Sequence, residues 1–553
     1  MSAADRFAGF VTVRDGRVVD ASGTPLLLRG MGLGNWLLAE GYMWRLSPGR
    51  ESAREIEALV VELVGSERAE RFWTDFRDRF ISADDIDRIA AEGMDHVRLP
   101  INWRVVMDPD GAILDDGMAL IDRLIGWCRD AGLWVLLDLH GAPGGQTGTN
   151  IDDSNGQPEL FMDERNVELT ERLWVELATR YRDETAVLGY DLLNEPLPNE
   201  WQHRYAAELA ALYRRLSAAI RRVDTQHLIM YEGSHWATNW SIFDEVWDPN
   251  SVLQFHKYWS PPDRPTIQQF IDVGERLGLP IYMGEGGENN TSWLATAFQL
   301  YEDHGIGWNF WPWKKIDTLT SPCSIDAPSG WAEIVAYANG AGPQPPSEDA
   351  WATLCDLVAA SHIDRCTYRP EIVRALFRRV PISLPATAFG FAGPGRSHDT
   401  SDATPLSGFR SDDAVTITLG DLDELPAFEH TDGTPDPDLT VVLAEGDWVA
   451  YDIESVDTAA LDIDVWPADG STIDGTAPLV VVDGVGLDVT ASDGCWVARS
   501  PGPVRSGRHV VRVEGPAGGV AFRRLDVRDR ADSTTSERLG HGALDEAVGS
   551  DVA

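Results

Sequence analysis

The sequence predicts an α/β fold, a (β/α)8 TIM barrel followed by a smaller antiparallel β-sandwich. Three observations support this prediction. The chain has 553 residues, which is long for one ordinary domain and suits a barrel with a second domain. Over residues 1–376, short apolar runs alternate with longer amphipathic stretches. Over residues 409–530, short strand patterns follow one another without an intervening helical pattern.

Eight apolar runs in the first region have the length and composition of strands. A continuous apolar run is typical of a parallel strand that is buried on both faces. The stretches between them, such as residues 117–132 and 201–223, carry apolar residues at helical spacing. We therefore expect a barrel domain over residues 1–376. The eight predicted strands are residues 25–33, 96–100, 133–140, 187–194, 227–233, 251–259, 280–287 and 306–313.

The second region begins with a change of composition. Residues 377–408 are rich in Pro, Gly, Ser and Asp, which predicts a linker or a domain edge. Residues 409–530 then contain strand patterns separated by turn residues, which predict the β-sandwich. The polar, charged tail at residues 531–553 is expected to be disordered, because it has too few apolar residues to bury.

The chain is strongly acidic. It has 89 Asp and Glu residues against 46 Lys and Arg residues, which gives a formal net charge of −43. Such a charge disfavours binding to nucleic acid and to anionic membranes. It is also typical of proteins from salt-loving organisms, and an acidic proteome rich in Arg gives the same composition.

The cysteines and the N-terminus bear on where the protein resides. The five cysteines have no CxxC spacing, so we expect neither a disulfide framework nor a zinc site, and we predict no cofactor. Residues 1–16 lack the basic start and apolar core of a secretory signal, which predicts a cytoplasmic protein unless a leader is missing from this sequence. No apolar run reaches the roughly 18 to 20 residues of a membrane span.

Two glutamates stand at the ends of two predicted strands. Glu195 lies at the end of LGYDLLNEP and Glu285 near the end of PIYMGEGG, and Pro or Gly follows each carboxylate at once. In an α/β barrel the C-terminal ends of the strands meet at one face, where catalytic residues gather. Glycoside hydrolysis needs two carboxyl groups, because one protonates the leaving oxygen while the other attacks the sugar or activates water. The pair therefore predicts a glycosidase.

Further polar and aromatic side chains are expected at the same end of the barrel. Arg98 could hold Glu285 ionised by its opposite charge, as a nucleophile requires. Glu195 would need a raised pKa in order to donate a proton. An Asn beside it can bond the sugar hydroxyl next to the reacting carbon. The residues expected there are Arg98, His140, Asn194, His256, Tyr258, Trp311 and Trp313.

The order of these patterns along the chain, Arg, His, NEP, H-x-Y and GE, resembles that of glycoside hydrolase family 5. The resemblance covers about residues 20–320 and implies a retaining glycosidase with its two carboxyl groups roughly 5 Å apart. It implies that Glu195 is the acid/base and Glu285 the nucleophile. The residues that it places around the reacting sugar are Arg98, His140, Asn194, His256, Tyr258 and Trp311.

Three segments are most similar to the exo-β-1,3-glucanase branch of that family: GMGLGNWLLAEGYMW, DLHGAPGGQTG and FWPWKK. The implied substrate is a β-glucan-type oligosaccharide that is shortened from one end. The C-terminal region, with EGDWVAYDI and HVVRVEG, resembles a carbohydrate-binding module of the family 6 kind. Three more residues are expected to contact substrate, namely Trp36, Asn150 and Trp236.

Several alternatives remain open at this point. The enzyme could instead be an endo-β-1,4-glucanase, a β-mannanase or a glycolipid glycosidase, and a catalytically silent sugar-binding protein is a candidate of another class. The acidic pair at residues 152–153 is interpreted as part of a solvated or sugar-contacting loop, in preference to a cation site. The sandwich could bind sugar or only brace the barrel, and the sequence does not determine the oligomeric state.

Overall fold

The computed structural model describes residues 6–468, 473 and 476–530. Two compact units are formed, the first by the described residues up to Val373 together with Pro426–Asp436, and the second by Arg374–Leu425 and the described residues from Pro437 to 530. The chain thus first leaves the barrel unit after Val373. The tail that we predict to be disordered, residues 531–553, lies outside the described residues.

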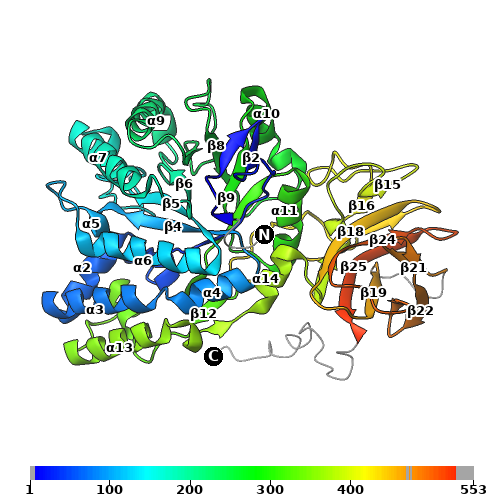
Figure 1. Cartoon of the computed structure of the whole chain (residues 1–553). Helices are drawn as coiled ribbons and strands as arrows, with labels where there is room; N and C mark the ends of the chain where they lie inside the picture. The colour runs from blue at the N-terminus through cyan, green and yellow to red at the C-terminus, as the bar shows by residue number, and fades with distance from the viewer. Residues whose placement is uncertain (1–5, 469–472, 474–475, 531–553) are drawn as a thin grey trace. The chain divides into compact units, whose positions relative to one another are not determined.

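Eight parallel strands close into the predicted barrel (Figure 1). Around the barrel the order is β10, β3, β4, β5, β6, β7, β8 and β9, so strands that are consecutive in the chain are also neighbours in space. Each strand falls on one of the eight predicted apolar runs. Their bounds are Arg29–Gly32 (β3), His96–Asn102 (β4), Trp134–Gly141 (β5), Val187–Asp191 (β6), Leu228–Glu232 (β7), Ser251–His256 (β8), Ile281–Gly287 (β9) and Gly307–Trp311 (β10).

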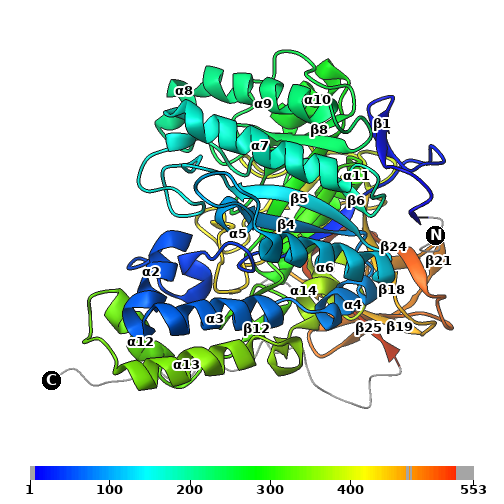
Figure 2. The same ribbon diagram turned by 60° about the vertical axis from the view of Figure 1, so that its left-hand side comes forward.

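Amphipathic helices pack around the strands (Figure 2). Helix α9 shows the pattern: Leu209 and Leu216 are buried while Arg214 is exposed to solvent. Helices α7 and α9 pack against each other, and α13 packs on α2 and α3. The helix bounds are Ala53–Val64 (α2), Ser66–Arg79 (α3), Ala83–Ala91 (α4), Trp103–Val106 (α5), Asp115–Ala131 (α6), Glu164–Tyr181 (α7), Trp201–Arg204 (α8), Ala206–Arg221 (α9), Gln268–Leu277 (α10), Thr291–Asp303 (α11), Trp331–Ala338 (α12), Ser347–Ala360 (α13) and Pro370–Phe377 (α14).

The N-terminal end of the barrel is filled by apolar side chains. Leu136, Met230 and Val252 from the barrel strands form a buried cluster that includes Val11. The hairpin of β1 (Thr12–Arg14) and β2 (Arg17–Val19) adds partly buried apolar side chains to this cluster. This end is therefore a packed core, and the buried ionic network described below lies nearer the C-terminal ends of the strands.

Two features of the first unit lie outside the regular alternation. After β10 a small sheet forms from β11 (Lys314–Ile316), β12 (Cys323–Ile325) and β13 (Thr367–Tyr368). The segment Pro426–Asp436, expected within the sandwich, belongs to the barrel unit. Two asparagines after β9 bind it, because Asn289 Nδ2 donates to the carbonyl of Phe428 at 2.8 Å and Asn290 Nδ2 to that of Thr434 at 3.0 Å.

The second unit is the predicted antiparallel β-sandwich. One sheet has the order β16-β17-β25-β19-β23-β22, with β14 also paired to β25, and the other has the order β15-β18-β24-β20-β21. The stretch expected to be a linker or domain edge supplies β14 and β15. The strand bounds are Ile382–Pro385 (β14), His398–Asp399 (β15), Thr416–Thr418 (β16), Thr440–Leu443 (β17), Trp448–Ser455 (β18), Leu461–Pro467 (β19), Leu479–Val482 (β20), Val485–Gly486 (β21), Asp488–Ser492 (β22), Cys495–Arg499 (β23), Gly507–Glu514 (β24) and Val520–Asp529 (β25).

The aromatic side chains of the sandwich are mostly used in packing. Tyr451 is buried and its hydroxyl donates to the carbonyl of Ala386 at 2.6 Å, and Trp496 is buried as well. Trp448 is half-buried with the guanidinium of Arg512 4.4 Å from its ring centre. These contacts favour a packing role for all three rings over a flat sugar-binding platform.

All five cysteines are free thiols. Among the helices of the described residues, none combines the length and the apolar character that crossing a bilayer requires.

Candidate active site

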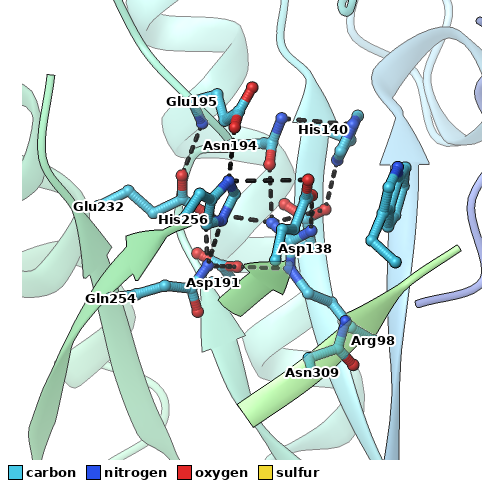
Figure 3. A network of polar contacts seen from close by, with 12 residues as sticks. Arg98, Asp138, His140, Asp191, Asn194, Glu195, Glu232, Gln254, His256 and Asn309 are labelled. Carbon is cyan, nitrogen blue, oxygen red and sulfur yellow. Dashed lines mark hydrogen bonds and ion pairs between the residues drawn. The ribbon is translucent and has the colours of Figure 1, made fainter. Parts of the chain in front are cut away.

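Arg98 on β4 lies at the centre of a buried polar network (Figure 3). Its Nε donates to Asp191 at 2.9 Å, and its Nη2 donates to Asn194 at 2.8 Å and to Glu232 at 3.1 Å. Its Nη1 donates to Glu285. A fully buried guanidinium is tolerated only when carboxylates and amides satisfy it, so Arg98 fixes the positions of the groups that surround it.

Glu285 on β9 is bound from both of its carboxylate oxygens. Oε1 accepts the bond from Arg98, and Oε2 accepts a bond from the Tyr258 hydroxyl at 3.1 Å. His256 Nδ1 lies 3.7 Å from Oε2. The register of β8 against β9 shifts between Phe255 and His256, which places His256 opposite Glu285.

Glu195 follows β6 and approaches the same place from the other side. Its Oε1 lies 2.6 Å from His256 Nδ1, and its backbone N–H donates to Glu232 Oε2 at 2.7 Å. One carboxylate oxygen of Glu195, one of Glu285 and a ring nitrogen of His256 all lie within 4.8 Å of one another. The closed barrel therefore brings together two glutamates whose strands, β6 and β9, are not neighbours.

His140 and Trp311 form a second part of the cluster. The two rings are stacked with centroids 5.5 Å apart. His140 Nδ1 donates to Asp138 at 2.7 Å, and Asn194 Nδ2 donates to His140 Nε2 at 3.3 Å, which defines one neutral tautomer. The indole has room because the neighbouring strand β3 carries a glycine beside it: a Cβ at Gly32 would lie 2.5 Å from the Trp311 ring.

The protonation states of the network follow from burial and from neighbouring charges. Burial lowers the pKa of His140 to about 4, so it is neutral at pH 7. Burial opposes a charge on His256 too, but Glu232, Glu285 and Glu195 outweigh it and raise the pKa of His256 well above the usual value. Burial also raises the pKa of Asp138, to about 8, although Arg98 acts against this.

The pKa of Glu285 is raised, whereas the sequence led us to expect that Arg98 would hold this carboxyl ionised. Burial is the largest influence and raises the pKa of Glu285, and the charge of Glu195 adds to it. His256 and Arg98 lower the pKa but do not compensate in full. Arg98 thus contacts Glu285 as expected, but the pKa of Glu285 remains above that of an ordinary glutamate.

The glycine-rich loop after β5 is shaped by two buried aspartates. Asp152 accepts the backbone N–H groups of Gln146, at 2.6 Å, and of Thr147, at 2.8 Å. Asp153 pairs with the guanidinium groups of Arg54 and Arg104. The two aspartates are therefore structural, contrary to the expectation of a solvated or sugar-contacting pair.

The Asp153 pairing leads to a testable prediction about stability. Asp153→Ala is expected to lower the free energy of unfolding by about 3 kcal/mol, because the buried indole N–H of Trp103 and the half-buried guanidinium of Arg104 lose the carboxylate that accepts their hydrogen bonds. Asp110→Ala is the matched control, since the Asp110 side chain is 98% exposed and should contribute less than about 0.5 kcal/mol. Urea unfolding of both variants measures the difference, and equal midpoints would contradict the assigned role.

Of the other residues expected to contact substrate, two lie outside the cluster around Arg98. Trp36 and Trp313 are buried, and their indole N–H groups donate to the carbonyl of Arg77 and to Asp85. Both indoles are therefore bonded to groups outside the cluster. Asn150 is half-buried on the loop after β5, and Trp236 is half-buried on the loop after β7, with a left-handed backbone (φ +58°).

The structure also adds residues that the sequence did not single out. Asp138 and Asp191 are charged residues within apolar strands, as Arg98 is, so the same sequence signal could have identified them. Glu232 ends β7 just before a glycine, and Glu285 is also followed by a glycine, so the same pattern could have identified Glu232. Glu40 comes from the loop after β3 and had no such signal. Its buried Oε1 lies 3.9 Å from His140 Nε2 and has no hydrogen-bond partner within the described part of the chain.

The chain is similar to one family model and to several known proteins. The family model for cellulase (glycosyl hydrolase family 5) matches residues 60–317. A beta-xylosidase from Phanerodontia chrysosporium is 33% identical, over 56% of this chain and 71% of the relative. A probable glucan 1,3-beta-glucosidase A from Aspergillus clavatus is 25% identical, over 60% of this chain and 90% of the relative. A crystal structure of an endogalactoceramidase aligns over 91% of this chain and 100% of its own, with 18% identity and a TM-score of 0.46. The strand-end carboxylates of the barrel, the cellulase family model and the 33% identical beta-xylosidase lead to one assignment: the chain belongs to glycosyl hydrolase family 5.

Proposed function

We propose that this O-glycosyl hydrolase releases sugar from one end of β-glucan-type oligosaccharides by a retaining double displacement, with Glu195 as acid/base and Glu285 as nucleophile. The observation that carries the proposal is the separation of the two carboxylates, whose nearest oxygens lie within 4.8 Å. Carboxyl groups about 5 Å apart suit a covalent intermediate, whereas inverting enzymes separate them by roughly 6.5 to 9.5 Å to admit a water molecule.

The contacts of the two glutamates support their different roles. Glu285 Oε1 stays bonded to Arg98 while Oε2 attacks, so one oxygen is held in place as the other forms the bond to the anomeric carbon. Glu195 gives its proton to the leaving oxygen, and in the second step it takes a proton from the water that releases the sugar. Asn194, held by Arg98, is placed to bond the hydroxyl beside the reacting carbon.

Bonded polar groups beside His140 and Trp311 support action at a chain end. Trp311 Nε1 donates to the Tyr42 hydroxyl at 2.9 Å, and the Lys315 ammonium lies 5.4 Å from the Tyr42 ring centre. Lys315 also donates to Glu288. Glu40 Oε1 accepts no hydrogen bond from the described residues and is placed beside this group to accept one from a hydroxyl of a terminal sugar.

The substrate class is supported by the relatives. Several of them are named glucan 1,3-beta-glucosidases, which favours a β-1,3-linked glucan oligosaccharide. The relative at 33% identity is named a beta-xylosidase, so hydrolysis of β-xylosides is the second candidate.

A substrate panel tests the proposal. Purified protein is incubated, in low and in multimolar salt, with 4-nitrophenyl β-glucoside and β-xyloside and with laminari-, cello- and manno-oligosaccharides. Release of one small sugar from the first minutes, with retained β-configuration by NMR, is expected for laminari-oligosaccharides. Early products of mixed length, or a product of inverted configuration, would contradict the proposal.

The raised pKa of Glu285 predicts the acid side of the pH–activity profile. As pH falls, Glu285 takes up a proton at a higher pH than an ordinary glutamate and can no longer attack the sugar. The acid limb of kcat/KM is therefore expected to have its midpoint above about 4.3, the usual pKa of a glutamate, and activity should recover on return to neutral pH. A profile that stays flat down to pH 4 would contradict this assignment.

A further inference from the structure

Glu232, the last residue of β7, contacts several of the groups around Glu195 without being one of the two reacting carboxylates. Its side chain is fully buried. Oε2 accepts the backbone N–H of Glu195 at 2.7 Å, and Oε1 accepts bonds from Arg98 at 3.1 Å and Gln254 at 2.5 Å. His256 Nε2 lies 3.3 Å from Oε1 (Figure 3). One carboxylate is therefore shared between the backbone of Glu195 and the imidazole that faces its side chain.

The backbone at Glu195 needs such a bond. Glu195, Leu197 and Asn199 have left-handed φ values of +42°, +54° and +49°, a conformation that costs of order 1 kcal/mol or more for each residue other than glycine. The surrounding structure fixes this turn. The Leu197 N–H donates to the carbonyl of Gln146 at 3.1 Å, and the carbonyl of Leu197 accepts from His235 at 3.1 Å. The Glu195 N–H itself is bound by Glu232.

The side chain of Glu195 is linked to Glu232 through His256. His256 Nδ1 lies 2.6 Å from Glu195 Oε1, while Nε2 faces Glu232. With Glu232 ionised, both ring nitrogens face carboxylates, and a doubly protonated ring can donate to both. The charged groups packed around the ring are Glu195 after β6, Glu232 on β7 and Glu285 on β9.

We infer that Glu232 is a positioning residue for the acid/base of this enzyme. It fixes the left-handed backbone of Glu195 and orients the His256 ring that faces the Glu195 side chain, and it does not touch the sugar. The inference rests on the proposed function, because it requires Glu195 to transfer the proton.

The test uses a series of aryl β-glycosides whose leaving groups differ in basicity. A basic phenol leaves only with help from the acid, whereas 2,4-dinitrophenolate leaves without it. Glu232→Gln is expected to lower kcat/KM about 10²-fold for the poorest leaving group and less than about 5-fold for the dinitrophenyl substrate. A purely structural role would lower both values by the same factor.

The matched control is Asp224→Asn, in the turn that precedes the same strand. Asp224 is a buried carboxylate that lies 2.6 Å from a histidine ring nitrogen, His227 Nδ1, and accepts a bond from Tyr190. This variant should lower thermal stability and leave the ratio between good and poor leaving groups unchanged. If Glu232→Gln does not fold, Glu232→Asp keeps the charge but cannot reach the Glu195 N–H, and the same selective loss is expected.

A double-variant cycle gives an independent readout. Because Glu232 acts through Glu195, adding Glu232→Gln to Glu195→Gln should cost less than about 2-fold, although the single change costs about 10²-fold. Equal costs in both backgrounds would overturn the inference. A wild-type enzyme that turns over no aryl β-glycoside would instead overturn the proposed function, and the positioning role with it.

Discussion

Glu285→Gln is expected to lower kcat/KM by about 10⁴-fold or more for every glycoside that the enzyme hydrolyses. The amide has nearly the shape of the carboxylate and can still interact with Arg98 and Tyr258, but it cannot form the covalent bond to the anomeric carbon. Because both steps of the double displacement pass through that bond, the loss should not depend on the leaving group. Initial rates with the dinitrophenyl and the unactivated substrate measure this.

A smaller variant identifies the role of Glu285 directly. Glu285→Gly leaves space for a small anion, so added azide should attack the sugar from the face that Glu285 occupied and restore turnover with an activated substrate. The product is expected to be the α-glycosyl azide, of inverted configuration. Glu208→Gln, an exposed position on α9, is the control and should keep full activity. Substantial activity of Glu285→Gln without azide would contradict the assignment.

Glu195→Ala is expected to show a loss that depends strongly on the leaving group. For a poor leaving group kcat/KM should fall by about 10³- to 10⁴-fold, because the leaving oxygen is no longer protonated. For the dinitrophenyl substrate the first step should remain fast, and the covalent intermediate should accumulate because the second step lacks its base. A rapid burst of dinitrophenol followed by a slow steady state is the expected time course.

Azide separates this variant from the previous one. With Glu195→Ala, azide needs no base and attacks the covalent intermediate, so the product is expected to be the β-glycosyl azide, with retained configuration. The two variants thus yield opposite configurations if Glu285 is the nucleophile and Glu195 the acid/base. The same configuration from both would show that the roles are wrongly divided.

The eight strands could be predicted because each is a local pattern. A strand buried on both faces must be apolar along its length, and this property is visible in residues 133–140 or 280–287 without any knowledge of neighbours. The segment Pro426–Asp436 could not be placed in the same way. Its membership of the barrel unit depends on bonds from Asn289 and Asn290, which lie more than a hundred residues away in the chain.

The candidate site shows the same division. The position of a carboxylate at a strand end, before Gly or Pro, singled out Glu195 and Glu285, but Glu232 carries the same pattern and binds the backbone of Glu195 instead of facing its carboxylate across the site. Trp36 and Trp313 were grouped with the site by their neighbours in the sequence, whereas their side chains point into the core.

The sequence by itself determined the barrel, the β-sandwich and the two glutamates, because hydrophobic pattern and strand-end chemistry are properties of short segments. Only the tertiary structure decided what each buried charge does. The pKa of Glu285, the charge of His256 and the partners of Glu232 all depend on burial and on distances of a few ångströms between residues from different strands. Those distances are set by how the barrel closes, and no short segment of the sequence contains them.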